Sequence, residues 1–161
     1  MLELLTPMNK LERVSRSIDA ATFVAAPGIW AQVQADGSLL NALNNVRAKV
    51  NKLVIGSAST DKYESHDVEV GRITTLETLG CRVKTDTAGF GTTIDGSLAS
   101  GDLLLVSSKT ETLGKLLVTS TSTANCGGAG DYEVVARLEE VSVTGGYVVY
   151  RTISPYLLAK S

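Results

Sequence analysis

Four short runs rich in Val, Leu and Thr follow one another in the second half of the chain. They read "DLLLVSS" (102–108), "GKLLVTSTST" (114–123), "DYEVVARLEEVSV" (131–143) and "GGYVVYRTI" (145–153). Gly-bearing turns separate them at a near-regular spacing, which is typical of an antiparallel β-sandwich or a small β-barrel. Pro155 follows the last run and predicts its end, because proline cannot donate to a central ladder.

The first half predicts further strands and one helix. The stretch 28–40 alternates and contains the turn signal Asp36-Gly37, and 51–57 reads as another strand. Residues 66–87 alternate as a hairpin that closes near 78–80. Ser38 is a candidate N-cap for a short helix near 39–50, since Leu39 and Leu43 begin a helical apolar face there.

Composition agrees with a mainly β globular fold. The 161 residues are 43% hydrophobic, 20% charged and only 5% aromatic, with 15 glycines. The length fits one domain, or two very small modules that share a core. We expect a small antiparallel β-barrel or sandwich over 29–161, preceded by a segment 1–28 of a different character.

Short segments of the first half of the chain recur in similar form in the second half, which raises the possibility of an internal duplication. "DGSL" occurs at 36–39 and 95–98, and "NKLVIGSAST" (51–60) parallels "GKLLVTSTST" (114–123). "VGRITTLE" then parallels "VARLEEVS", and "GCRVKT" parallels "GYVVYRT", in the same order. A repeat of two similar β-units, 29–90 and 91–157, would leave this trace. Chance similarity within a Val/Thr/Ser/Gly-rich chain is the alternative.

The N-terminal segment has two open interpretations. Apolar residues precede Pro7, and after it the spacing predicts a short amphipathic helix over roughly 8–20. The segment would be either a docking arm or a helix packed on its own barrel. The apolar anchors of such an arm are Leu2, Leu4, Leu5, Leu11 and Val14.

The search for chemistry predicts that the chain is not an enzyme. His66 is the only histidine, and no GxSxG motif supplies a nucleophile for it. The Gly-rich stretches match neither the phosphate-loop nor the dinucleotide pattern, so we expect turns there and no cofactor. Four aspartates are expected to be solvated turn residues and not a metal site: Asp86, Asp95, Asp102 and Asp131.

Charge and cysteine content exclude several classes of partner. The formal net charge is −2 and the pI about 5.4, and aromatic and basic residues are not interleaved, so nucleic-acid binding is not expected. No apolar run reaches the ~20 residues of a membrane span, and the N-terminus does not read as a secretory signal. Cys81 and Cys126 are expected to be free thiols in a reducing compartment, with a single disulfide as the alternative.

The few aromatic residues are candidates for subunit contacts, because Tyr and Trp suit surfaces that are half dry. If 147–150 is a strand, Tyr147 and Tyr150 face opposite ways and at most one belongs to the core. The alternative buries one tyrosine and leaves the others at the rim. The residues predicted to contact other copies of the chain or another protein are Trp30, Tyr147, Tyr150 and Tyr156.

The C-terminal part resembles the decoration, or cement, proteins of tailed-phage heads. The resemblance lies in "SGDLLLVSS", "GKLLVTSTS" and "GDYEVVARLEEVSVTGGYVVYRTISPY", across roughly 96–157 and less closely 28–90. Those proteins show a Gly-Asp entry into a strand, a Gly-Lys-Leu hairpin, a "VVA-x-L-E" strand and a Gly-initiated last strand. This chain is longer than the smallest members.

The resemblance implies a non-catalytic structural protein, made in the host cytoplasm, that coats the outer surface of the virion head. Its partners would be the major capsid protein and copies of itself, as a dimer or trimer. Residues 1–28 would be an arm over neighbouring capsid subunits. The alternative function is a β-rich receptor- or carbohydrate-binding module of a phage tail or fibre, for which Trp30 would be the tryptophan platform.

Overall fold

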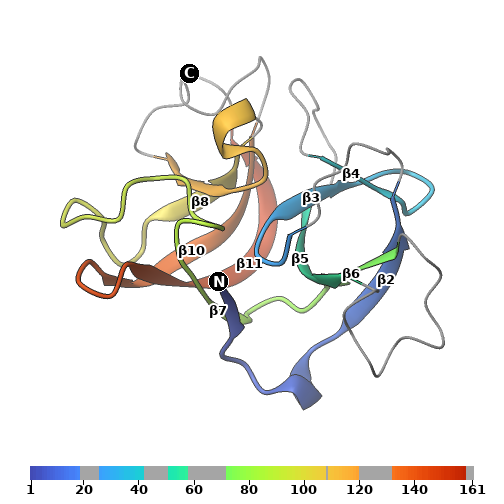
Figure 1. Ribbon diagram of the computed structural model, residues 1–161, viewed down its shortest axis with the longest axis horizontal. Helices are drawn as coiled ribbons and strands as arrows, with labels where there is room; N and C mark the ends of the chain where they lie inside the picture. Colours follow the sequence, from blue (N-terminus) through green and yellow to red (C-terminus); the bar gives the residue numbers. More distant parts are fainter. Residues whose placement is uncertain (19–25, 42–50, 58–71, 108, 120–131, 159–161) are drawn as a thin grey trace.

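The protein is mainly β in this computed structural model, which describes residues 1–18, 26–41, 51–57, 72–107, 109–119 and 132–158. The strands form two antiparallel sheets that lie side by side (Figure 1). The predicted fold class, a small antiparallel β-barrel or sandwich, is therefore confirmed. Two short 3₁₀ helices, η1 (Met8–Lys10) and η2 (Thr110–Thr112), complete the regular elements of the described part.

The larger sheet has six strands and contains all four runs that opened the sequence argument. The order across the sheet is β1-β7-β11-β10-β8-β9. The bounds are β1 (Leu2–Leu4), β7 (Arg82–Thr85), β8 (Leu103–Val106), β9 (Leu116–Val118), β10 (Tyr132–Ser142) and β11 (Tyr147–Leu158). The hairpin of β10 and β11 is its longest element and projects beyond the rest of the sheet (Figure 1).

The second sheet has five strands and curls toward closure. Its order is β2-β6-β5-β3-β4, with β2 (Arg13–Ser17), β3 (Trp30–Val33), β4 (Leu39–Asn41), β5 (Asn51–Ser57) and β6 (Arg72–Leu76). Just after β2, Ile18 forms a bridge with Leu39 of β4, the opposite end of the sheet. Arg16 Nη1 also donates to the Gly37 carbonyl oxygen at 3.1 Å, so the first and last strands meet.

Alternation along the strands divides the apolar residues between two cores. Trp30 of β3 and Leu53 of β5 face the larger sheet and join its buried side chains in one shared cluster. Their neighbours Ala31 and Val54 point the other way and fill the inside of the curled sheet. Because one cluster takes residues from both sheets, the two sheets form a single packed body.

The described residues of the N-terminal segment do not form the predicted amphipathic helix. Residues 13–17 are strand β2, paired antiparallel with β6, and of the described residues in 8–20 only 8–10 are helical. β1 pairs with β7 from Leu2↔Thr85 to Leu4↔Val83. The segment therefore contributes a strand to each sheet, where the second interpretation expected a packed helix. Residues 19–25 lie outside the described part.

The helix expected near 39–50 begins in a part of the chain that is extended. Residues 39–41 are β4, which pairs with β3 across the turn at Gly37. The proposed N-cap, Ser38, instead donates its N–H and its hydroxyl to Asp36 Oδ1, at 3.0 and 2.6 Å, and closes the hairpin turn. The prediction was wrong for 39–41, and residues 42–50 lie outside the described part.

The hairpin expected over 66–87 is instead a connection between the two sheets. β6 belongs to the five-stranded sheet and β7 to the six-stranded one, so the turn at 79–80 carries the chain across. Thr152 of β11, in the six-stranded sheet, binds the chain at this turn. Its N–H donates to the Cys81 carbonyl, and its own carbonyl accepts from Gly80 N–H. Residues 66–71 lie outside the described part.

Pro155 does not end the last strand, because β11 continues to Leu158. The β10–β11 register jumps from Ala136↔Thr152 to Val134↔Tyr156, so residues 153–155 stand opposite the single residue Val135. A bulge is one of the few places where a sheet tolerates proline, because the bulged residues leave the hydrogen-bond ladder.

The echoed segments do not occupy equivalent places. β5 lies between β6 and β3 in its sheet, whereas its counterpart β9 is at the end of the six-stranded order, beside β8. The two "DGSL" turns do match: Asp95 Oδ1 accepts from Ser97 N–H and its hydroxyl, as Asp36 does from Ser38. The shared feature is thus a local turn, and the strand order gives no symmetric pair of units.

Candidate functional site

Two of the four aromatic residues expected at contacts are core residues. Trp30 is 5% exposed and Tyr150 is 0% exposed, and both belong to the cluster shared by the two sheets. Neither side chain can reach a partner in this fold, so this part of the prediction was wrong. Burial raises the pKa of the Tyr150 hydroxyl, and the nearby Trp30 indole acts in the opposite direction. Neither Trp30 Nε1 nor Tyr150 Oη has a hydrogen-bond partner of adequate geometry.

The other two tyrosines lie at the surface of the β10–β11 hairpin, so the alternative of one buried tyrosine with the others at the rim is confirmed. Tyr147 is half-buried at the start of β11, with Lys84 Nζ 4.3 Å from the centre of its ring. Tyr156 is 42% exposed in the second half of the same strand. Their role in contacts with a partner stays a prediction.

Three large exposed apolar side chains lie at the two ends of this hairpin. Val143 at its tip is 54% exposed. Leu157, which is 45% exposed, lies next to Tyr156 at the opposite end, where Tyr156 pairs with Val134 of β10. Single exposed apolar residues are common, but two neighbouring ones on one strand form a candidate contact surface. We call Tyr156 and Leu157 the hairpin surface.

The five residues expected to anchor an arm are divided between core and surface. Leu2, Leu4 and Leu11 pack against the shared core cluster, and Val14 is half-buried in β2. Leu5 alone is exposed, at 38%. Four of the five are therefore committed to the chain's own packing.

Charged side chains on the outer face of the six-stranded sheet pair across the strands. Glu139 of β10 binds Arg151 of β11, and also Arg82 of β7 at 2.8 Å. Lys84 lies 3.5 Å from Glu3 of β1. The arginine hydrogen bonds hold the pKa of Glu139 below its usual value. Exposed pairs of this kind contribute little to stability but fix side-chain positions around the hairpin.

A second charged cluster joins the two sheets. Glu77 lies 2.9 Å from both Arg16 Nη2 and Lys52 Nζ, all three on the five-stranded sheet side. Glu133 of β10 comes from the other sheet, and its Oε1 accepts from the Asn51 backbone N–H at 2.9 Å. This cluster links the two sheets, and the sequence analysis did not predict it. The available signal was a glutamate in the apolar run "DYEVVA".

The two carboxylates of this cluster have opposite pKa shifts. Burial raises the pKa of Glu133, against the hydrogen bonds from Asn51 and the charge of Lys52. Burial acts on Glu77 in the same direction, but the hydrogen bonds and charges of Lys52 and Arg16 outweigh it and lower its pKa. Lys52 thus lies near two carboxylates: the charge of Glu77 is well compensated by its partners, and the charge of Glu133 is poorly compensated against its burial.

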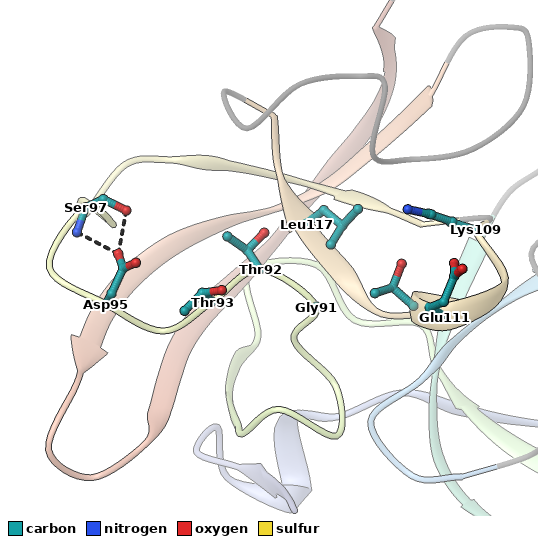
Figure 2. Close-up of a pocket in the computed structure, with 9 residues that line it drawn as sticks. Gly91, Thr92, Thr93, Asp95, Ser97, Lys109, Glu111 and Leu117 are labelled. Atoms are coloured by element: carbon teal, nitrogen blue, oxygen red, sulfur yellow. Dashed lines mark hydrogen bonds between the residues drawn. The ribbon is translucent and has the colours of Figure 1, made fainter.

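A groove of about 370 Å³, with both polar and apolar lining, opens on the six-stranded sheet (Figure 2). One wall is the Gly-rich connector, with Thr92, Thr93 and Asp95, and the other is the β8–β9 turn, with Lys109 and Glu111. The remaining lining residues are Gly91, Ser97, Thr112 and Leu117. The sequence analysis considered "GFGTTIDG" as a phosphate loop and rejected that interpretation. It could not predict that the β8–β9 turn lies opposite this segment.

Three of the four turn aspartates lie in the described part and accept hydrogen bonds there. Asp95 and Asp102 accept hydrogen bonds from Ser97 and Ala99 within their own turns, and Asp86 accepts from Ala88 N–H and the Met1 amino group. Within the described residues, no group of three or more His, Cys, Asp or Glu side chains is placed to hold a metal ion. His66, Asp131 and Cys126 lie outside the described part.

Two further features concern the thiols and the membrane. Cys81 is a buried free thiol. Among the described residues, no helix is both long enough and apolar enough to cross a membrane.

The comparisons with known proteins give no relative. No protein-family model, no curated protein and no solved structure matches this chain.

Proposed function

We propose that this chain is a non-catalytic structural protein that binds the outer surface of an assembled phage head and stabilises it. The observation that carries the proposal is the hairpin surface: the neighbouring residues Tyr156 and Leu157 are exposed near the end of β11. The same hairpin includes most of "GDYEVVARLEEVSVTGGYVVYRTISPY", one of the three segments that carry the resemblance to head decoration proteins.

The partner is the major capsid protein, with copies of this chain as neighbours in a dimer or trimer. An apolar surface on a paired hairpin suits this role because it loses little conformational entropy on binding. Each contact can be weak, since many copies on one shell hold the coat collectively. A coat that binds only the expanded shell stabilises that shell by mass action.

The proposal differs from the sequence-based expectation in its contact region. Leu2, Leu4 and Leu11 pack on the core, so a docking arm over 1–28 no longer supports binding. The alternative, a receptor- or carbohydrate-binding module, loses the stacking platform expected at Trp30, because that residue is 5% exposed. We therefore place the contact on the hairpin.

Co-sedimentation with bare, expanded phage heads tests the proposal. We expect wild-type chain to pellet with the heads to saturation, and the double variant Tyr156→Ser/Leu157→Ser to bind at least ten-fold more weakly. Leu79→Ser is the matched control, because Leu79 is 54% exposed but lies off the hairpin. Absence of wild-type binding, or equal binding by the double variant, would contradict the proposal.

A further inference from the structure

The groove of Figure 2 has an apolar floor that depends on glycine. A Cβ added to Gly91 would lie 2.7 Å from Leu117 Cδ2 and 3.2 Å from Thr112 Cγ2. The backbone at Gly91, the Leu117 methyl group and the Thr112 methyl group therefore pack directly against one another. Any larger residue at 91 would push this floor apart. The floor is thus a small, preformed patch of C–H groups in a groove whose walls carry polar side chains.

The walls of the groove carry hydroxyl, carboxylate and ammonium groups. Thr92 Oγ1 is committed, because it accepts from the Val118 N–H at 3.1 Å, whereas Thr93 is exposed at the mouth. Asp95 is fixed by its two bonds from Ser97, which lower its pKa and keep it ionised at neutral pH. Lys109 and Glu111 supply an ammonium and a second carboxylate from the opposite wall (Figure 2).

This combination matches the chemistry of a sugar. A pyranose ring has a face of C–H groups and a rim of hydroxyls, each of which both donates and accepts hydrogen bonds. Carboxylates such as Asp95 and Glu111 accept from such hydroxyls, and the Lys109 ammonium donates to them. A volume of about 370 Å³ lies at the lower end of the range for small-molecule sites, which fits about one or two sugar rings.

We propose that this groove binds a saccharide, with its C–H face on Leu117 and Thr112 and its hydroxyls on Thr93, Asp95, Lys109 and Glu111. This activity goes beyond the proposed head binding and uses a different surface. A chain bound to a shell through its hairpin would leave the groove available, so a coated particle would carry many weak sugar sites.

Screening on a glycan array, followed by NMR titration, tests the groove. The probes are the array saccharides and, in solution at millimolar concentration, the methyl glycosides of glucose, galactose and N-acetylglucosamine. We expect at least one probe to shift the backbone amides of residues 91–97 and 109–112. The double variant Lys109→Met/Glu111→Gln should weaken that binding at least ten-fold, and Thr93→Ala several-fold.

Ser100→Ala is the control, because Ser100 is exposed on the same connector but does not line the groove. It should bind as wild type does. All three variants change exposed side chains, so an unchanged amide spectrum elsewhere will show that each remains folded. Absence of binding to every saccharide, or binding that the groove variants leave unchanged, would overturn the proposal. This test uses no phage heads, so a negative result would contradict the saccharide proposal and leave the head-binding proposal unaffected.

Discussion

The backbone N–H of Asn51 donates to Glu133 Oε1 at 2.9 Å and joins the central strand of one sheet to the longest hairpin of the other. That hairpin carries the proposed contact surface, and the charged cluster around Glu133 is one of its links to the other sheet. Glu133 and Glu77 both lie near Lys52, yet their pKa values are shifted in opposite directions. This difference gives a matched pair of predictions.

Glu133→Gln should leave the chain slightly more stable at neutral pH. Burial raises the folded-state pKa of Glu133, so its stabilising contribution is present below the unfolded pKa and is lost as pH rises through the folded one. Glutamine keeps the acceptor for Asn51 and removes the buried charge. We expect Tm to rise by about 1–2 °C at pH 7 and the gain to vanish in acid. Thermal melts from about pH 4 to about pH 8 check it.

Glu77→Gln should act in the opposite direction. The pKa of Glu77 is lowered, so its contribution is present above the unfolded pKa and is lost as pH falls through the folded one. The variant leaves Arg16 and Lys52 without their carboxylate and should lose about 1.5–3 kcal/mol at neutral pH. Urea unfolding measures it. Equal effects of the two Glu→Gln changes would contradict the different environments of the two carboxylates.

Leu4→Ala should destabilise the fold, because Leu4 packs on the shared core from strand β1. The side chain is half-buried, so we expect a loss of about 1–2 kcal/mol, below the 2–5 kcal/mol of fully buried leucines. Leu5→Ala is the control: Leu5 is 38% exposed, and its change should stay within about 0.5 kcal/mol. If Leu4→Ala left unfolding unchanged, the segment would be a free arm after all.

Gly114→Ala should be severely destabilising, by about 3 kcal/mol or more. Gly114 has φ +76°, and its carbonyl accepts from Trp30 N–H at 2.8 Å, where the two sheets touch. An added Cβ would lie 2.7 Å from the Trp30 carbonyl oxygen and would also clash with the Ile29 side chain. Gly96→Ala is the control, since nothing lies within 4 Å of its Cβ position. Similar unfolding curves for both variants would contradict this packing.

Tyr150→Phe should be neutral or stabilising, although most core substitutions destabilise. The Tyr150 hydroxyl is buried without an adequate hydrogen-bond partner, so removing it also removes a desolvated polar group. A loss of about 1 kcal/mol or more would mean that the Trp30 indole N–H does donate to it. Chemical denaturation, followed by Trp30 fluorescence, distinguishes the two results.

The sequence predicted the strands whose pattern is local. "DLLLVSS" and "DYEVVARLEEVSV" are strands because each places apolar residues on both faces of a sheet that is buried on both sides there: Leu104 faces the shared core and Leu105 the opposite face. The turn at Asp36-Gly37 was also predicted, because its turn chemistry is contained in a few residues, whereas strand β4 after it was not. Such signals need no knowledge of distant partners.

Features decided by distant pairing were not predicted. Leu11, Val14 and Ile18 fit a helical spacing, yet Val14, Arg16 and Ile18 alternate equally well as a strand, and only pairing with β6 chooses between them. The same limit applies to the candidate site. The groove places Lys109 and Glu111 opposite Thr93, and the inter-sheet cluster places Glu133 beside Asn51, through contacts between segments far apart in the sequence.

Cryo-electron microscopy of expanded phage heads incubated with the chain tests the central proposal most directly. We expect lattice-ordered density for the β-body on the outer surface, oriented so that Tyr156 and Leu157 touch the major capsid protein. Heads that stay bare at saturating concentration, or density in which the β10–β11 hairpin points away from the shell, would contradict it.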